Sequence, residues 1–146
     1  MTFSKAIKTA ALSLMIALPV AGAAAAGHST VTVQQFGFGN GAGAAQTGFM
    51  NNMGIFQNGG FNTTIASQDG NFNTTVVGQT GWGNAATATT IGSGNIVGVA
   101  QMGNGNSADV GVLGNGNAIG VIQIGDGNSA SATQVGTGNV TVIVQY

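Results

Sequence analysis

From Gln35 to the end of the chain, apolar and polar positions recur with glycine and asparagine at a spacing that never changes. An eleven-residue unit of the form Gln-x-Gly-x-Gly-Asn-x-Ala-x-Val-x repeats ten times, and an eleventh copy begins at Gln145. No insertion or deletion interrupts this phase. A short, fixed repeat is typical of a stacked, quasi-one-dimensional structure in which each unit contacts only its neighbours.

The second half of each unit predicts a β-strand with one inward face. Side chains alternate along a strand, so the Asn, the residues two and four positions later and the following Gln all point the same way. The residue four positions after the Asn is apolar in all ten units: Ala44, Ile55, Ala66, Val77, Ala88, Val99, Val110, Val121, Ala132 and Ile143. A helix is disfavoured, because each glycine would cost about 1 kcal/mol relative to Ala and no 3.6-residue apolar stripe offsets that cost.

The first half of each unit predicts a tight corner, because glycine adopts the positive φ angles that such turns require. The second glycine of the corner is replaced by Met50, Phe61 and Phe72 in three units. The first glycine is present in all ten: Gly37, Gly48, Gly59, Gly70, Gly81, Gly92, Gly103, Gly114, Gly125 and Gly136. The Asn that follows the corner never varies: Asn40, Asn51, Asn62, Asn73, Asn84, Asn95, Asn106, Asn117, Asn128 and Asn139.

Two strands and two corners predict a coil of 22 residues, and hence an all-β fold: a β-solenoid of eleven strands, about five turns and on the order of 25 Å in height. Residues 22 apart would then lie above one another, so that identical amides can form hydrogen-bonded ladders, as in cross-β assemblies. One face carries glutamine at every level: Gln35, Gln57, Gln79, Gln101, Gln123 and Gln145. The other carries Gln46, Gln68, Thr90, Val112 and Gln134, and we expect this interrupted face to be the weaker one.

The first 26 residues resemble a secretory signal peptide, and we expect the repeat domain to span residues 27–146. Lys5 and Lys8 precede an apolar stretch over residues 10–20, and four alanines at 23–26 offer cleavage sites. This apolar stretch is too short for a typical transmembrane helix, so we expect no membrane-spanning segment.

Charge is almost absent from the predicted repeat domain, which contains His28 and no Lys, Arg or Glu. Nucleic-acid binding by phosphate neutralisation is therefore excluded. The acidic residues are Asp69, Asp109 and Asp126, all at outward or corner positions of the unit. Two interpretations of them stay open: ordinary solvated charges, or gatekeepers that slow premature assembly of a neutral, aggregation-prone chain.

The sequence offers little for catalysis or for metal and cofactor binding. There is no cysteine, and the predicted coil brings no two carboxylates together. The three aspartates fall at different phases of the unit, so they cannot form a calcium-binding column. The Gly-x-Gly-Asn corner lacks the following helix that a phosphate-binding loop needs. We therefore expect no enzyme, no metal and no cofactor.

The residue after each Gln is apolar in the later units and points outward. These residues would form two exposed columns, one on each face: Ile91, Met102, Leu113, Ile124, Val135 and Tyr146. Either they shield the neighbouring corner, or they make a lateral or docking contact. Aromatic residues gather instead in the first half, at corner and outer positions: Phe38, Phe49, Phe56, Phe61, Phe72 and Trp82.

The repeat resembles the curlin repeat, Ser-x5-Gln-x-Gly-x-Gly-Asn-x-Ala-x3-Gln, over essentially the whole repeat domain. The first unit matches it at Ser29, Gln35, Gly37, Gly39, Asn40, Ala42 and Gln46. Curlins are secreted subunits of curli, the extracellular functional amyloid fibres (a type of pilus) of bacterial biofilms. The resemblance therefore implies a secreted subunit that forms a homopolymer at the cell surface and takes part in cell adhesion, with a curli-type nucleator and an outer-membrane secretion channel as partners.

Two alternatives stay open besides a major-type subunit. A nucleating minor subunit would be expected to carry basic residues in its last repeat, and this chain has none there. A nucleator or accessory fibre subunit is therefore the less favoured interpretation. A non-polymerising β-solenoid that binds a ligand or surface is the other alternative, but its regular outward Thr-x-Thr ladders are represented only by residues 30–32 and 87–89.

Overall fold

The computed structural model describes residues 28–146, and the predicted signal peptide at 1–26 lies outside the described residues. Residues 28–146 form a β-solenoid without helices, as predicted. The eleven strands are β1 (Thr30–Phe38), β2 (Gly41–Thr47), β3 (Asn52–Gly60), β4 (Thr63–Asn71), β5 (Thr74–Trp82), β6 (Ala85–Ser93), β7 (Ile96–Asn104), β8 (Ser107–Asn115), β9 (Ala118–Ile124), β10 (Ser129–Thr137) and β11 (Val140–Gln145).

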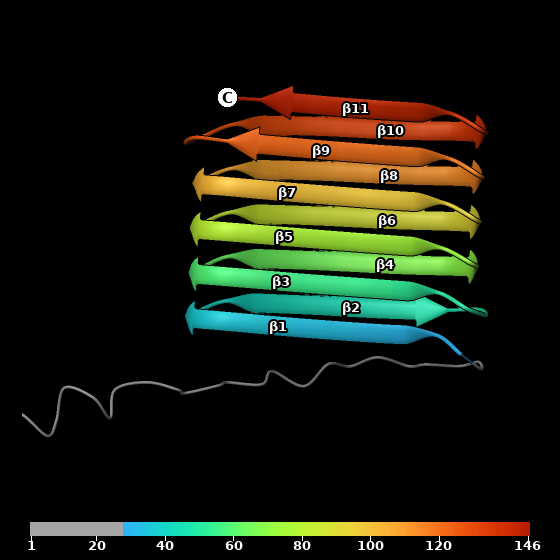
Figure 1. Ribbon diagram of the computed structural model, residues 1–146, viewed down its shortest axis with the longest axis horizontal. Helices are drawn as coiled ribbons and strands as arrows, with labels where there is room; N and C mark the ends of the chain where they lie inside the picture. Colours follow the sequence, from blue (N-terminus) through green and yellow to red (C-terminus); the bar gives the residue numbers. More distant parts are fainter. Residues whose placement is uncertain (1–27) are drawn as a thin grey trace, which may run out of the picture.

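The strands form two parallel sheets that face each other across a narrow core (Figure 1). The odd-numbered strands form a six-stranded sheet in the order β1-β3-β5-β7-β9-β11, and the even-numbered strands form a five-stranded sheet. Every pairing has a register of 22 residues, as in Gln57 opposite Gln79 and Ala66 opposite Ala88. The predicted coil length and strand number are therefore confirmed.

The corners are built as the glycine pattern predicts. All ten first glycines have positive φ, and so do the seven second glycines. Gly92 shows why the first position tolerates nothing larger: its φ is +123°, and a Cβ there would lie 1.9 Å from the Gly114 carbonyl oxygen in the next coil. Met50, Phe61 and Phe72 adopt the left-handed conformation of the second glycine, with φ of 53°, 56° and 58°.

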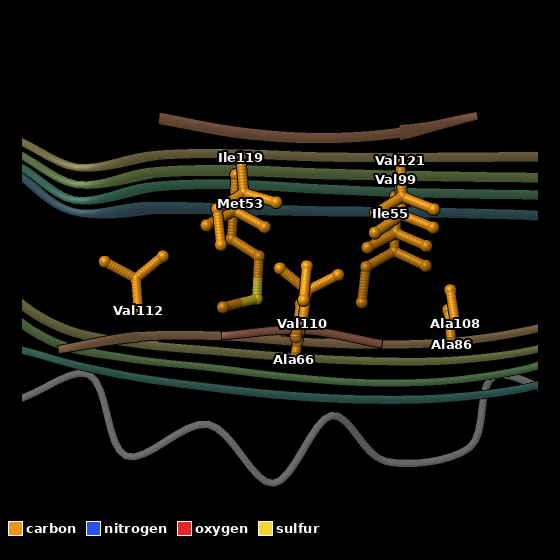
Figure 2. Close-up of a cluster of buried hydrophobic side chains, with 14 of the residues drawn as sticks. Met53, Ile55, Ala66, Ala86, Val99, Ala108, Val110, Val112, Ile119 and Val121 are labelled. Carbon is orange, nitrogen blue, oxygen red and sulfur yellow. The ribbon is translucent and has the colours of Figure 1, made fainter. Parts of the chain in front are cut away.

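Small aliphatic side chains fill the space between the sheets, in columns that follow the stacking direction. Figure 2 shows Ile55, Val99 and Val121 stacked on one sheet, with Ala66 and Val110 reaching toward them from the other. Of the ten apolar positions predicted to point inward, nine are buried, and Ile143 at the outermost level is partly buried. The alternation of inward and outward side chains is therefore confirmed. Within residues 28–146 there is no helix with the length and hydrophobicity needed to cross a membrane.

The exposed residues follow the predicted columns, with one exception. Ile91, Leu113 and Val135 form an exposed column on the five-stranded sheet, and Met102 is exposed on the other sheet. Ile124 is only partly exposed, unlike the prediction, since it lies beside the corner where its strand ends.

Candidate functional site

A continuous ladder of hydrogen-bonded glutamines runs the length of the six-stranded sheet on its inner face. We call it the glutamine ladder; its members are Gln35, Gln57, Gln79, Gln101, Gln123 and Gln145. Each Nε2 donates to the Oε1 of the next glutamine, 22 residues later, over 2.7–2.9 Å. The predicted amide ladder is therefore present on this face, and its four central members are buried.

A second set of hydrogen bonds fixes the direction of this ladder. From Gln57 onward, the Nε2 of each ladder glutamine also donates across the core to a backbone carbonyl 16 residues earlier, as in Gln57 to Gly41 and Gln79 to Thr63, both at 3.0 Å. A carbonyl can only accept a hydrogen bond, so the amide nitrogen must face it and the amide oxygen must face the preceding glutamine. Every ladder amide therefore points one N–H toward the C-terminal end of the stack, where the next glutamine accepts it.

Threonines on the opposite sheet complete the contacts of some glutamines. Thr64 Oγ1 accepts from Gln57 Nε2 and donates to Gln79 Oε1, at 3.2 and 2.9 Å. This contact was not predicted from the sequence. Its signal was present, because Thr64 and Thr75 are inward positions that lie seven residues after Gln57 and Gln68.

The five-stranded sheet carries only a fragment of the corresponding ladder. Gln46 Nε2 donates to Gln68 Oε1, and the column then continues with the buried Thr90 and Val112. Gln134 comes next, and its Oε1 is buried without any hydrogen-bond partner. In a continuous ladder, the side chain 22 residues earlier would donate a hydrogen bond to this oxygen. That residue is Val112, whose side chain has no N–H or O–H. The predicted interruption of this face is present in the structure.

The asparagines form a second ladder along both edges of the solenoid. Asn84 illustrates it: Nδ2 donates to Asn62 Oδ1 and to the Gly103 carbonyl, and Oδ1 accepts from the backbone N–H of Asn106. The side chains from Asn51 to Asn117 are buried, whereas Asn40, Asn128 and Asn139 near the ends are not. Each buried asparagine thus ties one corner to the corners above and below it.

The two ends of the stack differ in what they leave unpaired. In the part of the chain that the structure describes, β1 and β2 have no strand neighbour on one side, and β10 and β11 have none on the other. At the β10–β11 end, Gln145 Nε2 donates only to the Ser129 carbonyl, and Gln134 Nε2 only to Thr141 Oγ1. Each amide therefore has one N–H to spare. At the β1–β2 end, no side chain of residues 28–146 donates to the Oε1 of the first glutamine on either face.

The three aspartates lie apart on the surface. Asp69 accepts from Thr47 Oγ1, Asp126 accepts from the backbone N–H of Asn104, both at 2.8 Å, and Asp109 is exposed. In the described region, no three His, Asp or Glu side chains gather in a way that could hold a metal ion.

Aromatic side chains stack along both edges near the N-terminal end. Phe61 contacts Phe38 and Trp82 at centroid distances of 5.4 and 5.8 Å, while Phe49 contacts His28 and Phe72 on the opposite edge. The Trp82 ring covers Gly60 and the Phe61 ring covers Gly39. These rings shield glycines of the preceding coil, which helps to offset the strain of about 1–2 kcal/mol that the left-handed conformation costs Phe61.

No protein-family model matches this sequence, and no curated protein matches it either. The functional interpretation therefore depends on the ladders and on the two ends of the stack.

Proposed function

We propose that this protein is a secreted structural subunit that polymerises head to tail into extracellular, curli-like functional amyloid fibres of the biofilm matrix, which also serve surface adhesion. The observation that carries the proposal is the direction of the glutamine ladder. One end of the stack offers spare amide N–H groups and the other offers amide oxygens without a donor. Two copies of the chain are therefore complementary when the C-terminal end of one meets the N-terminal end of the next.

Like ends do not match in this way. Two β10–β11 ends would bring N–H donors against N–H donors, and two β1–β2 ends would bring oxygens against oxygens. A buried polar group without a partner costs about 1–3 kcal/mol, so pairing of like ends is disfavoured. A contact between unlike ends does not close on itself and generates a filament.

The strand numbers define how the next copy would dock. The coil alternates between the sheets and β11 belongs to the six-stranded sheet, so the next strand of a continued coil lies beside β10. We place β1 of the next copy there, with its Gln35 over Gln134, and its β2 over β11, with Gln46 over Gln145. Successive copies are then related by half a turn about the fibre axis.

The absence of charge repulsion supports the same proposal. Residues 28–146 contain three aspartates and no lysine, arginine or glutamate. None of the three aspartates lies in β1, β2, β10 or β11. Unpaired strand edges without charge or proline favour pairing with another chain. Export through an outer-membrane channel and nucleation by a curli-type partner remain part of the proposal through the curlin resemblance.

Incubating the purified protein tests this proposal. We expect dye-binding fibres with a cross-β reflection at about 4.7 Å along the fibre axis. Protein that stays monomeric with a β-rich circular dichroism spectrum would contradict the proposal and favour a non-polymerising, surface-binding solenoid. Incorporation into fibres of another subunit without self-assembly would favour an accessory role.

A further inference from the structure

The outward face of β7, β9 and β11 is apolar up to the corners at which β7 and β9 end. Eleven positions ahead of these corners face outward, and none of them carries a polar side chain; Asn104, which follows the corner glycine Gly103 at the end of β7, is exposed and polar. Val142 is 66% exposed and Ile96 59% exposed. We call this surface the apolar face; it consists of Ile96, Gly98, Ala100, Met102, Ala118, Gly120, Ile122, Ile124, Val140, Val142 and Val144.

The rest of the solenoid surface differs from this face. On the first half of the same sheet, outward positions of β1, β3 and β5 include threonine, asparagine and glutamine. The five-stranded sheet presents serine, threonine and two of the three aspartates. The apolar character is thus confined to one region of one sheet, and the overall composition of the chain does not explain it.

We propose that the apolar face is a lateral interface at which a fibre of this protein packs against a second fibre of the same protein. The inference rests on the proposed polymerisation, because it concerns contacts between assembled fibres. Its occupant is a second copy of the apolar face, turned by half a turn about an axis parallel to the stack. Such an interface is isologous, with the same residues on both sides.

The outward residues of β9 show that the middle strand of this face is complementary to itself. In chain order they are Ala118, Gly120, Ile122 and Ile124. The half-turn reverses the order on the second copy, so that Ala118 meets Ile124 and Gly120 meets Ile122. On β9 each large side chain therefore lies opposite a small one, which allows this strand to interdigitate with its counterpart as in a steric zipper. On β7 and β11 the half-turn brings Ile96 against Met102 and Val142 against Val144, so these strands contribute apolar contact without alternation of size.

Other occupants match this face less well. The backbone N–H and C=O groups of β9 are engaged by β7 and β11 on either side, so the face offers a partner packing and no hydrogen bonds. A membrane surface would be favoured by lysine or arginine beside the apolar residues, and residues 28–146 contain neither. An apolar and uncharged sheet surface fits best against another surface of the same kind.

The size of the face explains why it would act between fibres and not between monomers. Three strands about 4.8 Å apart and seven residues in length cover roughly 14 by 23 Å. Two such faces would bury about 650 Å², below the 1,200 Å² or more of a stable protein pair. Because successive copies in the proposed fibre are related by half a turn, the face recurs on each side of the fibre in every second subunit, and the contacts add along its length.

Threonine substitutions test this proposal without disturbing the strands. Ile122→Thr with Val142→Thr removes apolar surface but keeps β-branched side chains at exposed positions. The matched control is Ile65→Thr with Ile91→Thr, since Ile65 and Ile91 are 58% and 43% exposed on the other sheet. Polymerisation half-time is followed by dye fluorescence and fibre width by electron microscopy. If the double variant polymerises poorly, the single substitutions Ile122→Thr and Ile65→Thr provide the same comparison.

We expect wild-type and control fibres to associate laterally into bundles. Fibres of the Ile122→Thr, Val142→Thr variant should form at the wild-type rate, but their mean bundle width should be at least twofold smaller. Variant fibres that bundle as the wild type does would overturn the lateral interface and leave polymerisation intact. Wild-type fibres that stay single and bind neutral phosphatidylcholine vesicles would also overturn it, in favour of lipid. A wild-type protein that forms no fibres would contradict the proposed function, and the lateral interface with it.

Discussion

Replacing a central glutamine of the glutamine ladder by leucine should cost far more stability than the same substitution at Gln134. Gln79 is fully buried and makes four hydrogen bonds: it donates to the Thr63 carbonyl and to Gln101 Oε1, and accepts from Gln57 Nε2 and Thr64 Oγ1. Gln79→Leu leaves Gln101 Oε1 without a donor and the Thr64 hydroxyl without an acceptor.

The structure gives the size of this effect. A buried polar group left without a partner costs about 1–3 kcal/mol, so two of them cost about 2–6 kcal/mol. Burial of the apolar leucine side chain returns about 1–2 kcal/mol. From the midpoints of these two ranges, we expect Gln79→Leu to lower the free energy of unfolding by about 2.5 kcal/mol.

Gln134 is a matched control, because it occupies the same position in the repeat and is only 6% exposed. Its Nε2 makes one side-chain hydrogen bond, to Thr141, and its Oε1 already has no partner. Gln134→Leu loses the hydrogen bond to Thr141 but also removes the buried oxygen that has no partner. We therefore expect the free energy of unfolding to change by less than about 1 kcal/mol.

Equilibrium unfolding in guanidinium chloride, followed by circular dichroism at concentrations that keep the protein monomeric, measures both variants. Equal losses of unfolding free energy for Gln79→Leu and Gln134→Leu would refute the reasoning, because the hydrogen bonds of the glutamine ladder would then contribute nothing to stability.

Four further variants test the corners, the asparagine ladder and the aspartates. Gly92→Ala should prevent folding, as judged by circular dichroism, because its Cβ would clash with the next coil; Gly94→Ala should cost only about 1–2 kcal/mol, because a Cβ there meets nothing within 4 Å. Asn84→Ala should lower the unfolding free energy by about 3 kcal/mol in a denaturant titration, since it removes hydrogen bonds to two neighbouring coils; a loss below 1 kcal/mol would argue against the asparagine ladder. If the aspartates are gatekeepers, the triple Asn variant should shorten the fibrillation lag, and an unchanged lag would exclude that role for Asp69, Asp109 and Asp126.

The strands, the register and the inward face could be predicted from the sequence because the eleven-residue phase is unbroken. Once two units make a coil, the partner of each residue is the one 22 positions later, as Gln57 and Gln79 show. The corners could be predicted for the same reason, since glycine at a fixed phase indicates a fixed positive φ.

The direction of the glutamine ladder could not be predicted in this way. It depends on the bond from Gln57 Nε2 to the Gly41 carbonyl, and that bond requires the distance between the two sheets. The extent of the apolar face was also missed, although its residues are visible in the sequence. The face extends across three neighbouring strands of one sheet, so its residues come together only when the sequence is arranged in coils of 22 residues.

One contact is central to the proposed fibre: β1 of each copy continues the coil of the preceding copy, beside the β10 of that copy. The chain contains no cysteine, so single cysteines can be introduced at exposed positions without competing thiols. In the proposed junction, Gln34 of one copy lies over Thr133 of its neighbour, on the five-stranded sheet. Val144 lies on the opposite outer face of the solenoid.

Fibres grown from equal amounts of Gln34→Cys and Thr133→Cys protein should therefore give cross-linked dimers with a short bis-maleimide reagent. Fibres grown from Gln34→Cys and Val144→Cys protein should not. Efficient cross-linking of the second pair would contradict the proposed continuation of the coil from one molecule to the next. Well-formed fibres in which neither pair is cross-linked would contradict it too.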